Sequence, residues 1–358
     1  MKTIRVHLGA RSYPIVLGTD ILEALPGLAS ALGVAAQIAI VTDTRVAALH
    51  LGRLTAALRK GGCQVIEIVI PQGERQKSLA RANGIITSLL EARYSRRSAI
   101  LAFGGGVVGD VAGFASATFR RGIPLVQVPT TLLAQVESSI GGKTAVNHLL
   151  SKNAIGAYHQ PCLVFSDTAF LSTLPRREII CGVGEILKYG MLDRGIFGYL
   201  DAQISEILAG KPEALREIIY RCNMVKAKLI HDDEREERSG GGRAVLNLGH
   251  TVGHALEDLS RYRLRHGEAV VLGLRWELRI ALAAGRVDRA DAALFEDLLR
   301  RIPYHPAIGY IPRDRLIEKI VAQGASAGFV IPRKIGKVVV ARDIPAAVIR
   351  SVSRAFRP

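Results

Sequence analysis

Short apolar runs alternate with helix-like stretches through the first half of this 358-residue chain, and this alternation restricts the fold more than any other feature. The apolar runs are residues 38–41, 65–70, 99–103 and 125–128. Continuous, β-branched runs are typical of parallel strands buried on both faces, and the stretches 45–60 and 79–92 fit crossover helices. The pattern predicts a doubly wound, Rossmann-like α/β domain that binds ligands beyond the carboxyl ends of its strands.

The pattern changes near residue 175, where long helical stretches begin. They cover residues 177–191, 214–231, 250–258, 267–284 and 289–301. A chain of this length accommodates two domains. We therefore expect an α/β domain at residues 1–174 and a mostly α-helical domain at residues 175–358.

The net charge of +16 raises the possibility of a nucleic-acid partner. The basic residues are scattered, however, and no DNA-binding spacing is present, so we expect no nucleic-acid partner and assign part of the charge to an anionic substrate. Four widely separated cysteines argue against disulfides. No signal core opens the chain, and no apolar run approaches the ~20 residues of a membrane span. We expect a soluble, cytoplasmic protein without membrane contact.

Two glycine-rich segments suggest contacts with phosphate groups. Gly104, Gly106 and Gly109 fit GxGxxG between a strand and a helix, where backbone N–H groups are free to bind a pyrophosphate. A tight strand–helix turn explains this segment equally well. The segment from Gly141 to Thr144 resembles the end of a Walker A loop, but Glu137 replaces its first glycine, so we expect no P-loop and only an anion contact from Lys143.

Histidines in the second half point to a metal site. His250 and His254 are four residues apart on one helix face, and His266 begins another helical stretch. Three histidines in this arrangement favour a metal over ordinary structural roles. Glu185 is the candidate carboxylate ligand, although its pairing with Lys188 is also explained by a solvated ion pair. Three protein ligands would leave room for substrate oxygens on zinc.

Several longer segments carry a family resemblance. They are GGGVVGDVAGFASATFRRG, VPTTLLAQVESSIGGKTAVN, SKNAIGAYHQP, GEILKYG, and LNLGHTVGHALE followed by HGEAVVLG. Their order and spacing, from about residue 13 to residue 275, resemble the 3-dehydroquinate synthase family of sugar-phosphate cyclases. The resemblance implies conversion of 3-deoxy-D-arabino-heptulosonate 7-phosphate (DAHP) to 3-dehydroquinate and phosphate in the shikimate pathway. NAD would oxidise a hydroxyl and later return the hydride to the substrate, with Zn²⁺, Co²⁺ or a similar metal as Lewis acid.

The resemblance also implies roles for individual residues. Zinc ligands would be Glu185, His250 and His266. NAD would be bound by Asp43, Glu74, Lys77, Gly106, Val107, Val108, Gly109, Asp110, Thr130, Thr131, Lys143, Lys152, Phe170 and Thr173. Substrate would be bound by Lys143, Lys152, Asn153, Lys188, Lys226, Arg243, Asn247 and His254, of which His254, Lys188, Lys143 and Asn153 are the candidate catalytic residues. Arg121 would reach the neighbouring site of a homodimer.

The sequence departs from the family at four places. Glu137 replaces an aspartate, Ser151 replaces a glycine, and the loop 236–242 is about three residues longer. An expected Asp-Lys-Lys segment is absent before the C-terminal strand pair, where the chain reads from Gln323 to Phe329. Lys334 or Lys337 is the candidate replacement for the missing phosphate-binding lysine.

Three alternatives remain open at this point. The first is a sister cyclase that acts on sedoheptulose 7-phosphate or glucose 6-phosphate, and the second is a metal alcohol dehydrogenase resembling glycerol dehydrogenase. The third is a basic nucleic-acid-binding protein. Lys226 and Arg243 favour a substrate that carries both phosphate and carboxylate.

Overall fold

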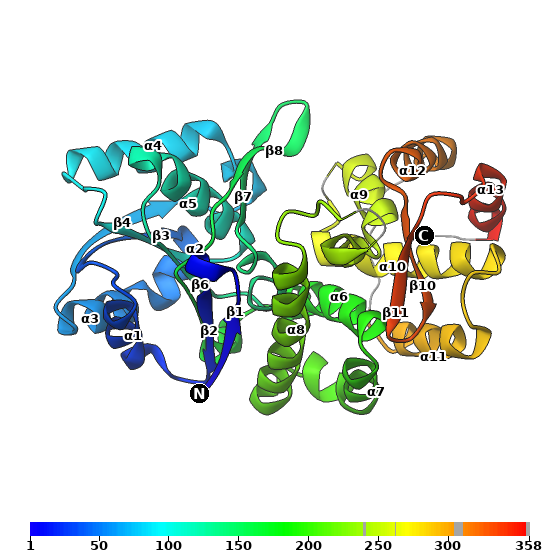
Figure 1. Ribbon diagram of the computed structural model, residues 1–358, viewed down its shortest axis with the longest axis horizontal. Coiled ribbons are helices and arrows are strands. Elements are labelled where there is room, and N and C mark those ends of the chain that lie inside the picture. Colours follow the sequence, from blue (N-terminus) through cyan, green and yellow to red (C-terminus); the bar gives the residue numbers. More distant parts are fainter. Residues whose placement is uncertain (239–240, 262, 304–310, 356–358) are drawn as a thin grey trace. The chain divides into compact units, whose positions relative to one another are not determined.

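The computed structural model describes residues 1–238, 241–261, 263–303 and 311–355. The chain divides into two compact units, which are shown in Figure 1. The first unit comprises Met1–Pro175 and Leu215–His231, and the second comprises Arg176–Ala214 and Asp232–Pro358. The segment Leu215–His231 thus belongs to the first unit, whereas the sequence places it within the domain 175–358.

A seven-stranded sheet forms the centre of the first unit, in the order β1-β2-β9-β6-β5-β3-β4. Its strands are β1 (Lys2–Val6), β2 (Tyr13–Gly18), β3 (Gln37–Asp43), β4 (Gln64–Ile70), β5 (Ala99–Gly104), β6 (Leu125–Pro129) and β9 (Leu163–Asp167). All neighbours are parallel except β1 and β2. Every residue of β5 and β6 is buried, which confirms the prediction from their continuous apolar sequence.

Helices cover both faces of this sheet, as a doubly wound fold requires. They are α1 (Leu25–Ala31), α2 (Thr44–Val46), α3 (Gly52–Lys60), α4 (Leu79–Glu91), α5 (Gly106–Thr118) and α8 (Pro212–Asp232). A π-helical turn, Ala47–Leu51, joins α2 to α3. One core packs α1 and α3 on the face that contains Phe103, and another packs α4 and α5 on the face that contains Ile100. The α/β class predicted for the N-terminal half is confirmed.

The strand order reverses between β3 and β5, because β4 pairs with one edge of β3 and β5 pairs with the other. Ligands of open α/β sheets bind beyond the carboxyl ends of the strands at such a switch point. The glycine segment that follows β5 therefore begins at this position, although it follows the third apolar run of the sequence and not the first. Asp43 ends β3 at the same edge.

An antiparallel hairpin of β7 (Lys143–His148) and β8 (Ser151–Tyr158) is the part of the first unit that strand alternation did not predict. Lys143 opens a strand, so Gly141 and Gly142 do not lead into a helix, and the expectation of no P-loop is confirmed. Leu149 and Leu150 at the hairpin tip are fully or almost fully exposed.

Helices dominate the second unit, as predicted. They are α6 (Arg176–Leu192), α7 (Arg194–Leu208), α9 (His250–Leu259), α10 (His266–Ala283), α11 (Arg289–Arg300), α12 (Arg313–Ala327) and α13 (Ala346–Ala355). A 3-10 segment, η8 (Gly242–Asn247), precedes α9, and a hairpin pairs β10 (Phe329–Lys334) with β11 (Lys337–Ala341). Most of α10 is buried, and it contacts α6, α9, α11, α13 and β10. None of the described helices is long and apolar enough to span a bilayer.

Glycines allow the backbones of α6, α9 and α10 to meet directly. A Cβ added to Gly184 of α6 would lie 2.2 Å from the carbonyl oxygen of Gly267 in α10. A Cβ on Gly267 would lie 1.8 Å from the oxygen of Cys181, and one on Gly273 would lie 1.9 Å from that of Gly249. These separations are far below van der Waals contact, so only glycine permits this packing.

We predict that Gly267→Ala destabilises the protein by about 1–3 kcal/mol or more, because its methyl group would meet rigid backbone. Urea unfolding followed by circular dichroism measures the effect. Gly198→Ala in α7 is the matched control, because a Cβ at Gly198 meets nothing within 4 Å. Alanine is the better helix former, so the control should be neutral or more stable by up to about 1 kcal/mol. Equal stability of the two variants would contradict the packing argument.

Candidate metal and cofactor sites

Three helices of the second unit bring Glu185, His250 and His266 together. Glu185 lies in the middle of α6, whereas His250 and His266 are the first residues of α9 and α10. Nε2 of His250 lies 3.4 Å from Oε1 of Glu185, and Nε2 of His266 lies 2.8 Å from the same oxygen. Their ligand atoms all lie within 4.8 Å of one another. A donor set of two histidines and one glutamate suits a catalytic zinc ion.

The carboxylate of Glu185 is fully buried beside an equally buried cation. Nζ of Lys188 lies 2.6 Å from Oε2 of Glu185, and neither side chain is exposed. A solvated ion pair, the alternative that the sequence left open, is therefore wrong. Burial alone would raise the pKa of Glu185, but Lys188 and His250 outweigh it and hold that pKa well below its usual range. The carboxylate is thus charged and able to bind a cation.

His266 is held at both ring nitrogens. Its Nδ1 lies 3.2 Å from Oε2 of Glu257, a residue that the sequence analysis did not single out. Burial would lower the pKa of His266, but hydrogen bonds to Glu185 and Glu257 raise it to about 10. Glu257 lies seven residues after His250 on α9, so helical periodicity was the signal that could have found it.

A third buried carboxylate contacts the start of α9. Glu277 of α10 accepts hydrogen bonds from the N–H groups of Gly249, at 2.5 Å, and Val252, at 3.3 Å. Burial raises the pKa of Glu277 to about 8. Because these N–H groups flank His250, Glu277 determines where the ligand-bearing turn lies.

His254 lies one helical turn after His250, as its spacing predicts. Its ring centroid is 5.2 Å from that of His250 and 5.9 Å from that of His266. His254 is exposed, whereas His250 is buried. The arrangement separates a buried ligand from an accessible imidazole that is able to exchange protons.

Most predicted cofactor residues of the first unit follow the carboxyl ends of the sheet's strands, whereas Lys143 and Lys152 lie on the β7–β8 hairpin. Asp43 ends β3, and its side chain accepts the N–H groups of Arg45 and Val46. Gly106, Val107, Val108, Gly109 and Asp110 form the first turn of α5 after β5, and Thr130 and Thr131 follow β6. The Thr130 hydroxyl is buried and has no hydrogen-bond partner within the described chain. Free N–H groups at the start of α5 and this hydroxyl fit a pyrophosphate.

Glu74 and Lys77, which follow β4, are tied to the hairpin. Asn147 donates its side-chain amide to Glu74 at 3.0 Å and its backbone N–H to the Lys77 carbonyl at 2.8 Å. Lys77 forms an ion pair with Asp110 of α5. Burial raises the pKa of Asp110, against the opposing effect of Lys77. Asn147 is thus a connecting residue that sequence reasoning missed.

Phe170 and Thr173 lie in a 3-10 segment, Thr168–Thr173, directly after β9. The Phe170 ring packs edge-on against Phe103 of β5, with centroids 5.1 Å apart. The hydroxyl of Thr173 lies 2.8 Å from Nε2 of His50. These residues extend the predicted cofactor edge to a fifth strand end.

The predicted substrate residues are divided between the units. Lys143, Lys152, Asn153 and Lys226 belong to the first unit, and Lys188, Arg243, Asn247 and His254 belong to the second. The N–H of Asn153 donates to Oδ1 of Asn147 at 3.0 Å. Lys226 is nearly buried and pairs with Glu137 at 2.8 Å, so the unusual glutamate contacts a predicted substrate residue.

Arg243 is also nearly buried. It donates from its guanidinium to the carbonyl of Glu234 at 2.7 Å, and its backbone N–H binds Asp233. Residues 239 and 240 of the lengthened loop lie outside the described residues. Lys334 and Lys337, the candidate replacements for the missing lysine, face each other as a register pair at the end of the β10–β11 hairpin, and both are exposed.

Arg121 lies just after α5 in an unusual backbone segment. Arg120 and Arg121 both have positive φ angles, 49° and 68°, in a turn that ends at Gly122. Non-glycine residues in this conformation cost about 1–3 kcal/mol each and cluster at functional sites.

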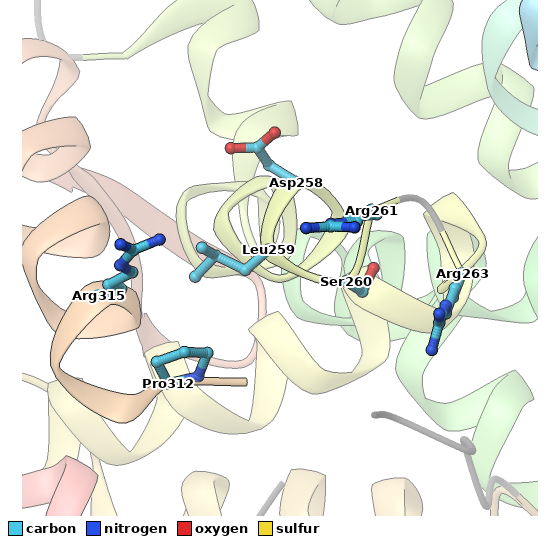
Figure 2. Close-up of a pocket in the computed structure, with 7 residues that line it drawn as sticks. All are labelled: Asp258, Leu259, Ser260, Arg261, Arg263, Pro312 and Arg315. Atoms are coloured by element: carbon cyan, nitrogen blue, oxygen red, sulfur yellow. The ribbon is translucent and has the colours of Figure 1, made fainter. Parts of the chain in front are cut away.

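A separate pocket of about 400 Å³ lies in the second unit (Figure 2). It is lined by Asp258, Leu259, Ser260, Arg261, Arg263, Pro312 and Arg315. Figure 2 shows the three arginines around the end of α9. None of the predicted site residues lines this pocket, so its size does not make it the candidate site.

Sequence comparisons place this chain among proteins of one biosynthetic family. Family models described as 3-dehydroquinate synthase N-terminal and C-terminal match residues 67–181 and 182–322. The 3-dehydroquinate synthase of Desulforamulus reducens is 41% identical over 98% of this chain and 99% of its own. That of Citrifermentans bemidjiense is 46% identical over 83% of this chain and 82% of its own.

Solved structures with the same fold include two other cyclases. A 2-deoxy-scyllo-inosose synthase complexed with carbaglucose-6-phosphate, NAD⁺ and Co²⁺ has a TM-score of 0.86 at 26% identity, covering 99% of this chain and 100% of its own. A 2-epi-5-epi-valiolone synthase from Streptomyces hygroscopicus with NAD⁺ and Zn²⁺ bound has a TM-score of 0.85 at 26% identity, covering 96% of both chains. An iron-containing alcohol dehydrogenase from Thermotoga maritima, at 14% identity and a TM-score of 0.68, shares the fold alone. Two matched family models and relatives above 40% identity show that this chain belongs to the 3-dehydroquinate synthase family.

Proposed function

We propose that this chain is a 3-dehydroquinate synthase, which converts DAHP to 3-dehydroquinate and phosphate with NAD and a divalent metal. The observation that carries the proposal is the convergence of His250 and His266 on one oxygen of Glu185. Relatives of that name match nearly the whole chain. The cytoplasmic location expected from the sequence belongs to the same proposal.

The metal would be held by Glu185, His250 and His266, and when bound it would supply Lewis-acid polarisation of a substrate oxygen. Both histidines direct Nε2 toward Glu185, and the charged carboxylate completes a three-ligand set. Lys188, 2.6 Å from Glu185, limits the negative charge of the site. Two cyclases of the same fold contain NAD⁺ with Co²⁺ or Zn²⁺, which supports this assignment.

NAD would bind at the carboxyl edge of the first unit and supply reversible hydride transfer. The first turn of α5 presents N–H groups to a pyrophosphate, and the buried Thr130 hydroxyl offers a further hydrogen bond. Asp43, at the end of β3, and Glu74, in the segment that follows the neighbouring β4, suit the hydroxyl groups of the adenosine end. The Lys77–Asp110 ion pair joins these two regions.

The chain's own residues would bind the anionic substrate and move protons. Lys143, Lys152 and Arg243 provide cationic groups that recognise phosphate and carboxylate through charge-assisted hydrogen bonds. Lys226 is oriented by Glu137, and Asn153 is fixed by Asn147. His254 is exposed beside the ligand cluster, so it is the residue placed to exchange a proton with the substrate.

Substrate choice within the family is the first test. Purified protein with NAD and Zn²⁺ receives DAHP, sedoheptulose 7-phosphate or glucose 6-phosphate, and phosphate release is measured. We expect release from DAHP alone, because Lys226 and Arg243 suit a substrate that carries a carboxylate as well as a phosphate. Release only from one of the other two would instead assign a sister cyclase.

The metal assignment has its own test. We expect His250→Ala to abolish turnover and to lower bound zinc, because two ligands remain of three. Metal content by mass spectrometry and phosphate release together measure the effect. His7→Ala, a histidine of the first unit exposed after β1, should keep both wild-type metal content and activity. A fully active, metal-replete His250→Ala protein would disprove the ligand set.

A homodimer in which Arg121 completes the neighbouring site belongs to the same proposal, and two inactive variants test it. Arg121→Ala and His250→Ala are mixed, unfolded together and refolded. Half of randomly formed dimers are mixed, and each mixed dimer contains one complete site, so we expect recovery of about one quarter of wild-type activity. No recovery, with dimers present by gel filtration, would place Arg121 in its own subunit's site.

A further inference from the structure

The two candidate histidine ligands are oriented in the same way. Each directs Nε2 toward Oε1 of Glu185 and Nδ1 toward another oxygen. For His250, that second oxygen is the carbonyl of Leu248, at 3.1 Å. For His266, it is Oε2 of Glu257, at 3.2 Å. A proton on Nδ1 would satisfy both oxygens and leave both Nε2 lone pairs for a metal.

Glu257 is held in place for this contact. It lies on α9, two helical turns after His250, and its side chain is only 6% exposed. A buried carboxylate is costly unless a charged or donating group compensates it, and Nδ1 of His266 provides a donor. Packing alone does not explain this buried carboxylate, since an apolar side chain would fill the same space without the desolvation cost.

A metal-bound histidine is usually fixed by an acceptor at its other nitrogen, which sets the tautomer and increases the basicity of the ring. Carboxylates do this more strongly than backbone carbonyls, because the hydrogen bond is charge-assisted. His266 is also the more exposed of the two rings, at 33% of its side chain against 11% for His250. The more accessible ligand thus has the stronger acceptor.

We propose that Glu257 is a positioning residue that orients His266 for metal binding through its Nδ1–H group. The inference rests on the metal ligands of the proposed function and adds a fourth residue that binds no metal itself. Its negative charge also offsets part of the charge of a divalent ion.

A competing arrangement uses Glu257 as a ligand. Atoms of His254, Glu257 and His266 also lie within 4.8 Å of one another and form a second group able to hold a cation. If both groups bound metal, His266 would have to bridge two ions with both ring nitrogens deprotonated. The 3.2 Å separation of Nδ1 from Glu257 instead fits a hydrogen bond with the proton retained.

The experiment measures metal binding directly. We titrate the metal-free wild type and the variants Glu257→Gln and Glu257→Ala with Co²⁺ and follow the visible absorption of the bound ion. Competition with a chelator then gives the dissociation constant of Zn²⁺ for each protein. Asp258→Asn is the matched control, because this neighbouring carboxylate pairs with Lys319 and does not face the ligands. Glu185→Ala reports on the ligand set itself.

We expect Glu257→Ala to weaken metal binding about 10–100-fold and to change the Co²⁺ spectrum, with one metal per chain in all proteins that bind. Glu257→Gln should weaken it less, because the amide oxygen still accepts a hydrogen bond, and Asp258→Asn should match the wild type. Glutamine keeps the shape of the side chain, so this variant carries the test if Glu257→Ala does not fold.

Two results would overturn the inference. Wild-type affinity and spectrum in Glu257→Gln and Glu257→Ala would show that Glu257 does not position His266. Two metals per wild-type chain, reduced to one in Glu257→Ala, would make Glu257 a ligand. Failure of the ligand set in the proposed function is a distinct outcome, because Glu185→Ala would then leave metal binding unchanged.

Discussion

Direct backbone contact between three glycine-bearing helices is the constraint on which the second unit depends. Gly184 and Gly267 bring α6 and α10 together, and Gly249 meets Gly273 where α9 begins. Each predicted metal ligand is the chain neighbour of one of these glycines. The positions of the ligands are therefore set by main-chain packing, which side-chain rotation cannot relax. Buried carboxylates add contacts at these positions: Glu277 accepts backbone N–H groups at the start of α9, and Glu257 lies 3.2 Å from Nδ1 of His266.

Much of this arrangement could be predicted from the sequence because local patterns carry it. Buried strands such as β5 are continuous apolar runs in the sequence. His250 and His254 share a helix face because of their spacing, whatever the tertiary arrangement of the helix. The third ligand was different. Residue types alone made Glu185 a candidate carboxylate. Its complete burial beside Lys188 results from tertiary packing, which local sequence patterns do not show. The motifs of the family supplied that information indirectly.

Other features could not be predicted, for physical reasons. The β7–β8 hairpin is half-exposed and polar, so it lacks the continuous apolar signal of the central strands. The segment Leu215–His231 has the helical texture of the second half, yet Ala227 and Ile230 pack in the core of β1 and β2. Glu257 resembles any helical glutamate until His266, nine residues away, folds against it. Long-range contacts decided all three.

The two functional regions differ in how they are specified, and this difference bears on substrate choice. The predicted metal ligands depend on backbone packing, which tolerates little change, whereas the predicted substrate cations Lys226 and Arg243 are long side chains with acidic or carbonyl partners. Lys226 contacts Glu137, a residue that departs from the family pattern, and Lys334 or Lys337 is only a candidate replacement for the absent lysine. Changes in these cations would alter charge geometry and leave in place the helices that carry the predicted metal ligands. Divergence among cyclases of this fold is therefore expected in the anion-binding side chains, with the metal centre unchanged.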